Sequence, residues 1–139
     1  MQIQPYLFFK GRCEEAIEFY RTTLDARVTH VIRFKDAPPG PDMRNAVANE
    51  NKIMHAAFQI GDTTILASDG DCSGSPNFAG FGLSLNAASD NDAQRLFGAL
   101  SDGGTVQMPL GKTFFASSFG MVKDRFGVSW MIVAGAAPA

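Results

Sequence analysis

Two polar side chains within an apolar stretch, residues 52–60, are the best candidates for chemistry in this sequence. Successive side chains of a strand point to opposite faces. Alternation gives one apolar face (Met54, Ala56, Phe58, Ile60) and one mixed face (Ile53, His55, Ala57, Gln59). An imidazole can orient a ligand or move a proton near neutral pH. We therefore predict His55 as a catalytic residue, with Gln59 beside it as a ligand-binding residue.

Other reactive side chains fit structural roles better. Asp69, Asp71 and Cys72 lie in the segment SDGDCSG, and Asp and Gly are the residues that turns select. Neighbouring carboxylates also disfavour the thiolate form of a cysteine, so we do not expect a nucleophilic Cys72. His30 lies on a separate strand with no matching set of polar residues, and we expect a structural role for it.

The last third of the chain is rich in aromatic residues. Phe115 and Ser117 lie on one face of a predicted strand over residues 114–122, where Phe115 offers a surface for stacking on a ligand. Both are predicted to contact the ligand. Trp130 alternates with Met131 on the next strand and is predicted to belong to the core.

Two series of elements carry these residues, in the same order. The first half predicts a strand at 3–9, an amphipathic helix at 13–24 and strands at 27–34, 52–60 and 63–68, with a loop at Pro38, Pro39, Gly40 and Pro41. The second half predicts a strand at 81–86, a helix capped by Ser89 or Asp90 that stops at Gly103-Gly104, and strands at 105–110, 114–122 and 128–133. Each half is β-α-β-β-β.

This order predicts an α+β fold of two βαβββ modules, residues 1–70 and 80–135, joined by a connector at 71–79 within one domain. Each module leaves one face of its curved sheet without a helix, and the two modules could pair these faces around a cup. Pockets prefer such junctions. A homodimer could complete the cup with a module from each chain.

Composition narrows the class of partner. The formal net charge is −2 and the sequence has no basic cluster, so we expect neither nucleic acid nor a membrane as partner. The two cysteines form no CxxC motif, and neither a signal peptide nor a membrane-spanning apolar run occurs. We therefore expect a cytoplasmic protein whose partner is a small molecule.

Three segments carry a family resemblance: PYLFFKGRCEEAIEFYRTTLDARV, MHAAFQIGDTTILASD and SFGMVKDRFGVSWMI. They resemble the PhnB-like branch of the vicinal-oxygen-chelate (glyoxalase/bleomycin resistance/dioxygenase) superfamily, and the resemblance implies the two-module cup fold. Members of this branch are often labelled demethylubiquinone methyltransferases. The sequence has no glycine-rich strand-to-helix motif of the kind that holds a nucleotide-like methyl donor, so we do not expect that activity.

The resemblance also implies where a metal would bind. In the superfamily, two ligands from each module hold a divalent ion that polarises the substrate. The superfamily pattern puts these four positions near Pro5, Leu66, Phe81 and Met131, and a slip of one residue would bring in Gln4. None of the four side chains is an oxygen or nitrogen ligand of the kind such ions need. We therefore expect no metal and no other cofactor, with Phe81 and Met131 lining a ligand site instead.

Three functions follow from these expectations. The leading hypothesis is a PhnB-like protein that binds a small, partly apolar organic molecule in the cup, with or without metal-free acid–base chemistry by His55. The second is a metal-dependent lyase, isomerase or dioxygenase whose ligands this placement misses. The third is a non-catalytic binder that sequesters a drug, as bleomycin-resistance proteins do. The fold alone does not separate them, because one fold hosts many chemistries.

Overall fold

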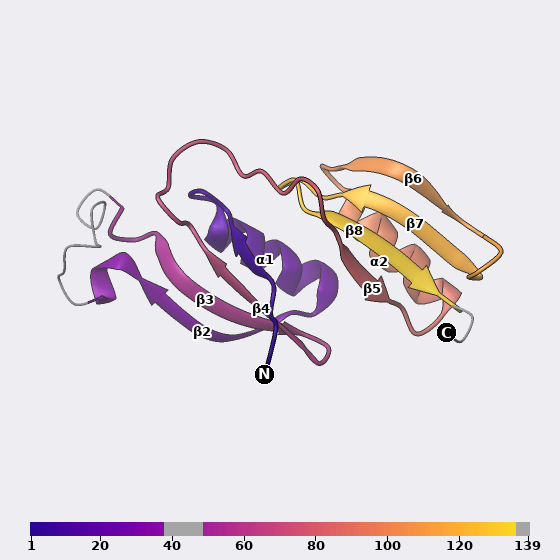
Figure 1. Cartoon of the computed structure of the whole chain (residues 1–139), viewed down its shortest axis with the longest axis horizontal. Helices are drawn as coiled ribbons and strands as arrows, with labels where there is room; N and C mark the ends of the chain where they lie inside the picture. The colour runs from indigo at the N-terminus through magenta and orange to yellow at the C-terminus, as the bar shows by residue number, and fades with distance from the viewer. Residues whose placement is uncertain (38–48, 136–139) are drawn as a thin grey trace. The chain divides into compact units, whose positions relative to one another are not determined.

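The computed structural model describes residues 1–37 and 49–135, and the loop predicted at Pro38 to Pro41 lies outside the described residues. The chain forms two compact units, Met1–Pro76 and Asn77–Ala139 (Figure 1). Each unit has the order β-α-β-β-β, so the predicted α+β class and the repeated element order are confirmed. The predicted cup between the modules stays a prediction.

The first unit is a four-stranded sheet with one helix. Its elements are β1 (Tyr6–Phe8), α1 (Cys13–Leu24), β2 (Arg27–Arg33), a short 3₁₀ helix (Phe34–Asp36), β3 (Ile53–Ile60) and β4 (Thr63–Ser68). The strand order is β1-β4-β3-β2, with β1 parallel to β4 and the other pairs antiparallel. Strand β1 is therefore at one edge of this sheet. It begins only at Tyr6, because Pro5 has no N–H to donate to a ladder.

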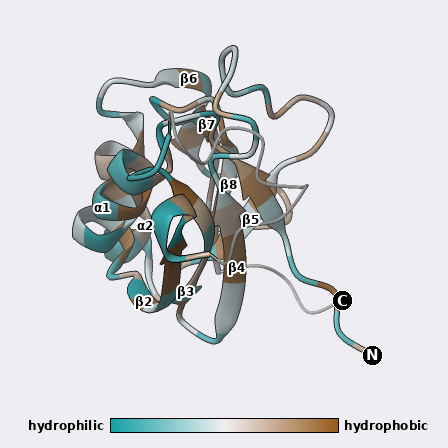
Figure 2. Cartoon of the chain, turned by 90° about the vertical axis from the view of Figure 1, so that its left-hand side faces the viewer, coloured by the Kyte–Doolittle hydropathy of each residue, from teal (hydrophilic) through white to brown (hydrophobic). Residues whose placement is uncertain are grey.

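Helix α1 spans the predicted residues and buries the predicted face. Cys13, Ala16 and Tyr20 are fully buried, and the ribbon of α1 carries both hydrophilic and hydrophobic stretches (Figure 2). The Tyr20 ring stacks on Phe58 of β3 with 5.9 Å between ring centroids. This contact identifies the face of the first sheet that the helix covers.

The second unit repeats the plan. Its elements are β5 (Leu83–Asn86), α2 (Asp90–Ser101), β6 (Thr105–Gly111), β7 (Ser118–Lys123) and β8 (Ser129–Ala134), and its strand order is β5-β8-β7-β6. The predicted N-cap is confirmed, since the Ser89 hydroxyl accepts a hydrogen bond from the N–H of Asp92. Trp130 is 3% exposed, which confirms the predicted core position. Neither helix in the described part of the chain is long and apolar enough to span a membrane.

The predicted strand at 114–122 starts too early. Strand β7 begins at Ser118, because the preceding residues form a tight turn around Thr113. Its hydroxyl accepts hydrogen bonds from the N–H groups of Phe115 and Ala116. A threonine hydroxyl that binds nearby backbone in this way competes with a strand ladder.

Strands β2 and β6, which lie at corresponding edges of the two sheets, contain the same irregularity. In β2 the register shifts between Val28 and His30, and in β6 it shifts between Val106 and Met108. A bulge adds one residue on the edge strand, so the side chains after it change face. The shift at matching points of the two units supports the internal repeat, and it decides where His30 points.

Candidate functional site

The face of the first sheet opposite α1 carries the candidate functional groups of this unit. Ala56 and Phe58 are fully buried on the helix side, so His55, Ala57 and Gln59 point the other way, as alternation predicted. Ile53 was expected on the same face but lines the groove beside α1, because the register shifts between His55 and Ile53. Strand register places further side chains beside them. We call this surface the open face; its members are Tyr6, Phe8, Arg27, His30, Ile32, His55, Ala57, Gln59, Thr64, Leu66 and Ser68.

Ala57 lies at the centre of the open face. Leu66 and His30 are its register partners on the two neighbouring strands, and His55 and Gln59 are its same-face neighbours along β3. Side chains at such positions are direct neighbours. A methyl group is thus surrounded by four larger side chains, so a ligand can approach the sheet most closely over Ala57.

Tyr6 and His55 form a hydrogen-bonded pair on this face. The Tyr6 hydroxyl lies 2.9 Å from Nδ1 of His55, and the two rings are 5.6 Å apart. Partial burial raises the pKa of the Tyr6 phenol, so the hydroxyl is protonated and can donate to Nδ1. A neutral imidazole that accepts at Nδ1 carries its proton on Nε2. His55 can then donate from Nε2 to a ligand.

His30 lies beside the Tyr6–His55 pair, and the three side chains form a cluster. The His30 ring centroid lies 6.0 Å from that of His55, although sequence reasoning found no matching group for it and expected a structural role. Strict alternation along β2 would place His30 on the same face as Val28. The register shift after Val28 turns it to the open face instead, and no sequence pattern marks that shift. Tyr6 was also missed, because its approach to His55 depends on the pairing of β1 with β4.

Gln59 is held from both sides on the open face. Its side-chain oxygen accepts a short hydrogen bond from the Arg27 guanidinium, and its amide nitrogen lies 3.5 Å from the Thr64 hydroxyl. The three residues come from β2, β3 and β4 and form one row across the sheet. Gln59 therefore joins Arg27 to Thr64 across the sheet, and its predicted contact with a ligand stays a prediction.

The predicted residues of the second unit occupy different surroundings. Met131 pairs with Met121 and Ser84 on the side opposite the buried Trp130. Met108 pairs with Met121 in turn, so three methionines form one row where the first unit has Leu66, Ala57 and His30. Thioether side chains are polarisable and adaptable but do not ionise. The groups suited to acid–base chemistry are thus in the first unit.

Phe81 and Phe115 are exposed aromatic side chains, and Ser117 is engaged elsewhere. Phe81 precedes β5 and is 50% exposed, and Phe115 packs edge-on against Phe119 with 5.0 Å between ring centroids. The Ser117 hydroxyl donates to Asp90 at the start of α2, over 2.6 Å. We therefore leave Ser117 out of the site proposed below.

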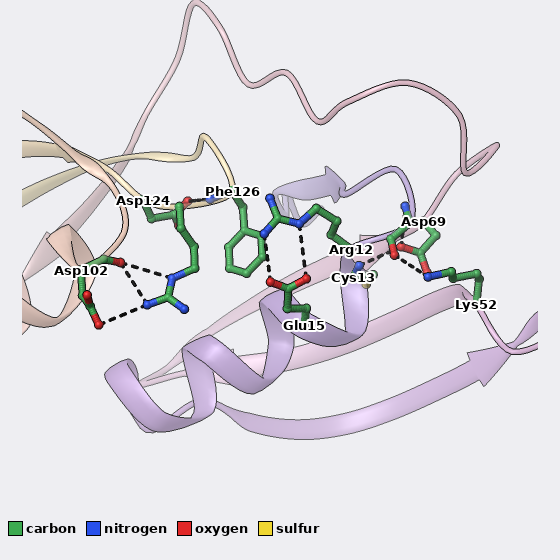
Figure 3. Close-up of polar contacts among 10 residues, drawn as sticks. Arg12, Cys13, Glu15, Lys52, Asp69, Asp102, Asp124 and Phe126 are labelled. Carbon is green, nitrogen blue, oxygen red and sulfur yellow. Dashed lines mark hydrogen bonds and ion pairs between the residues drawn. The ribbon is translucent and has the colours of Figure 1, made fainter.

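Asp69 has the structural role that was favoured for it. Its carboxylate is 1% exposed and accepts hydrogen bonds from the N–H groups of Gly11, Cys13 and Ile53 over 2.9, 2.8 and 2.7 Å. Figure 3 shows the bond from Cys13. Arg12, the N-cap of α1, makes no side-chain cap, so Asp69 supplies the acceptor that the helix N-terminus needs. Burial and the Asp69 charge raise the pKa of Cys72, in agreement with an unreactive thiol.

A groove lies on the covered side of the first sheet, beside α1. Its volume is about 310 Å³, and it is lined by Ile17, Val28, Val31 and Ile53 and by the ion pairs Glu14–Arg33 and Glu18–Arg21. The hydrogen-bonded partner Arg33 lowers the pKa of Glu14. Charges that are already paired offer little to a ligand, so this groove is the weaker candidate for chemistry.

The residues present do not fit the metal of the superfamily. In the strand register, the residue beside Leu66 is Tyr6 and the residue beside Met131 is Ser84. The four positions to compare with a metal site are therefore Tyr6, Leu66, Ser84 and Met131, with Tyr6 in place of Pro5 and Ser84 in place of Phe81. A phenol, an alcohol, a leucine and a methionine are not a donor set for a divalent ion. Within residues 1–37 and 49–135, no three His, Cys, Asp or Glu side chains lie close enough together to hold a metal. We derive no step through a metal.

Comparison with known proteins decides the family. A family model described as 3-demethylubiquinone-9 3-methyltransferase matches residues 1–133. The chain belongs to this family. Protein YjdN of Escherichia coli (strain K12), 35% identical over 138 residues, is similar along 95% of this chain and 94% of its own. The expected PhnB-like resemblance is confirmed.

Solved structures agree with this assignment. Protein PA1353 from Pseudomonas aeruginosa is 43% identical, with a TM-score of 0.82 over 96% of this chain and 97% of that chain. A PhnB protein from Bacillus cereus is 26% identical, with a TM-score of 0.79 over 96% and 99%. A glyoxylase/bleomycin resistance protein/dioxygenase domain from Frankia sp. EAN1pec, 14% identical with a TM-score of 0.60 over 100% and 95%, shares the fold.

The activity named in the family description needs a methyl donor, and the two described loops that lead from a strand into an α-helix lack the glycine-rich pattern that would hold one. Nucleotide-like cofactors bind where a glycine-rich loop leads from a strand into a helix. The loop from β1 to α1 has one glycine, Gly11, and the loop from β5 to α2 is Ala87-Ala88-Ser89. The described loops therefore give no support to methyl transfer.

Proposed function

We propose that this member of the family binds a small, partly apolar organic molecule on the open face, over Ala57. The observation that carries the proposal is the cluster of Tyr6, His55 and His30 beside that methyl group. Apolar surface from Leu66, Phe8 and Ile32 surrounds these few polar groups. Ligand sites combine a mainly apolar lining with a small number of placed polar groups, which is the composition of this face.

The cluster suits a ligand oxygen that accepts or exchanges a proton. The Nε2–H of His55 donates to a carbonyl or hydroxyl oxygen, and the Tyr6 phenol holds the imidazole in that tautomer. When Nε2 gives up a proton, Nδ1 takes the phenol proton and Tyr6 is left as a phenolate that regains a proton from water, so the pair can act as a short relay. This is metal-free acid–base chemistry of the kind a histidine performs near neutral pH.

Phenol is a suitable neutral probe, because it has one flat apolar ring and one hydroxyl. In an amide chemical-shift titration, phenol should shift the resonances of His55, Ala57 and His30. Ala57→Phe fills the space over Ala57 and should abolish these shifts. Val28→Phe, on the covered side, is the matched control and should leave them unchanged. Shifts that survive in Ala57→Phe, or that centre on the groove beside α1, would refute the proposal.

A second probe, acetophenone, tests whether the protein catalyses a reaction as well as binding a ligand. Acetophenone has methyl protons that exchange with D₂O only when a base removes them and an acid stabilises the oxygen. If His55 donates to the ketone oxygen while the neighbouring His30 imidazole accepts the methyl proton, the wild-type protein accelerates this exchange and His55→Gln does not. Absence of acceleration identifies a binder without turnover, the sequestering alternative.

We also propose that the protein is a cytoplasmic homodimer. The proposal rests on the family resemblance and on two cysteines that are both free thiols, which suits a reducing compartment. Sedimentation at micromolar concentration should give twice the chain mass of 14.9 kDa. A single species at the mass of one chain would contradict the dimer.

A further inference from the structure

Arg27 is the one arginine of the described residues without an ionic partner. Six arginines lie in residues 1–37 and 49–135, and Arg12, Arg21, Arg33, Arg95 and Arg125 each pair with a carboxylate. Arg27 hydrogen-bonds instead to the neutral amide of Gln59. Two arginine–glutamate pairs line the groove on the covered side, whereas this positive charge on the open face is left uncompensated.

No aspartate or glutamate belongs to the open face, and the acidic residues next to its Arg27 row in the chain are Asp25 and Asp62. The eleven members of this face include one arginine and two histidines. The chain as a whole carries a formal net charge of −2, so this local sign is opposite to that of the molecule. Arginine presents a planar fork of donors that matches a carboxylate with two parallel hydrogen bonds. Gln59 occupies part of that fork and restrains its direction.

Register fixes the spacing between Arg27 and the histidine cluster. Arg27 pairs with Gln59, and His30 pairs with Ala57. Same-face positions two residues apart on a strand are separated by about 7 Å. That is roughly the length of a benzene ring with polar groups at opposite ends. One end of such a molecule would lie at Arg27 and the other at His30, because His55 is two such steps, about 14 Å, from the row of Arg27 and Gln59.

From this geometry we propose that the natural ligand is an organic carboxylate anchored by Arg27, with a hydrogen-bonding oxygen at its other end. The inference rests on the proposed function and adds the chemical class of the ligand. Arg27 and His30 then bind opposite ends, and Gln59 is a positioning residue for Arg27. Ala57 and Leu66 form the apolar floor between them.

The test compares 4-hydroxybenzoate with 4-hydroxybenzamide, which has the same shape and no charge. By calorimetry, the wild-type protein should bind the carboxylate at least about tenfold more tightly, as expected of a charge-assisted pair. Arg27→Gln should lose this preference and keep its affinity for the amide. Arg21→Gln removes an arginine of α1 and should leave both affinities unchanged. Gln59→Met should reduce the preference without abolishing it.

Each outcome of this test decides between the two claims. Equal affinity of the wild-type protein for both compounds, with shifts around Ala57, overturns the carboxylate anchor and leaves the proposed function standing. A preference that survives in Arg27→Gln also overturns the anchor. Failure of both compounds and of phenol to bind overturns the proposed function itself. Circular dichroism and the urea midpoint establish that each variant is folded.

Discussion

Removing the Asp69 carboxylate should be among the most destabilising single changes in this protein. Oδ1 accepts from Gly11 and Cys13, and Oδ2 accepts from Ile53. A hydrogen bond to a charged group contributes about 1.5–3 kcal/mol net, so Asp69→Ala removes three such bonds, roughly 4.5–9 kcal/mol in sum. The whole free energy of unfolding of a domain is about 5–15 kcal/mol. Asp69→Ala should therefore be marginally folded.

Asp69→Asn separates the oxygens. It keeps one oxygen for Gly11 and Cys13 but turns an NH₂ group toward the N–H of Ile53, so one bond is lost, about 1.5–3 kcal/mol. Urea unfolding followed by circular dichroism, with linear extrapolation, measures both variants. Asp62→Asn, an exposed turn residue, is the control and should unfold near the wild-type midpoint at pH 7. Equal costs for the Asn and Ala variants, or a cost below about 1 kcal/mol for Ala, would refute this reasoning.

Three further predictions concern stability and thiol chemistry. Trp130→Phe removes the hydrogen bond from Nε1 to the Asp124 carboxylate, 2.9 Å long, and should cost about 1.5–3 kcal/mol in urea unfolding; an unchanged midpoint would contradict it. The pKa of Asp71 is held at about 2, below its ordinary 3.8, so its contribution is present above about pH 4 and is lost as the pH falls toward 2. Unfolding curves of Asp71→Asn and the wild type should therefore converge over that range, and a constant offset down to pH 2 would argue against the assignment. Burial raises the pKa of the Cys13 thiol far above its ordinary value. In the native protein, a thiol reagent should therefore modify Cys72 alone, and only slowly. Fast modification of Cys13 would contradict this prediction and would mean that α1 opens readily.

Local sequence patterns predicted most of the fold because the elements follow their own periodicities. Apolar residues at spacings of three and four fixed α1 at Cys13–Leu24, and Ser89 marked the start of α2. The early start predicted for β7 failed because the Thr113 hydroxyl captures two backbone N–H groups, a local competition that strand propensity does not contain.

The candidate site could be predicted only in part, for a similar reason. Alternation along β3 was enough to turn His55 and Gln59 away from the helix. The bulge in β2 that brings His30 to the same face leaves no mark in residue types. The approach of Tyr6 to His55 depends on a pairing between strands far apart in the chain. The register between paired strands therefore decides which polar side chains lie together, and the residue pattern of a single strand does not predict that register.

The most direct test of the proposed binding function is an intermolecular nuclear Overhauser measurement on the protein with bound phenol. The open face predicts contacts from the phenol ring to the Ala57 methyl group, to the Leu66 methyl groups and to the His55 imidazole. Contacts to the methyl groups of Val28 and Val31 would instead place the ligand in the groove beside α1, and would contradict the proposed site.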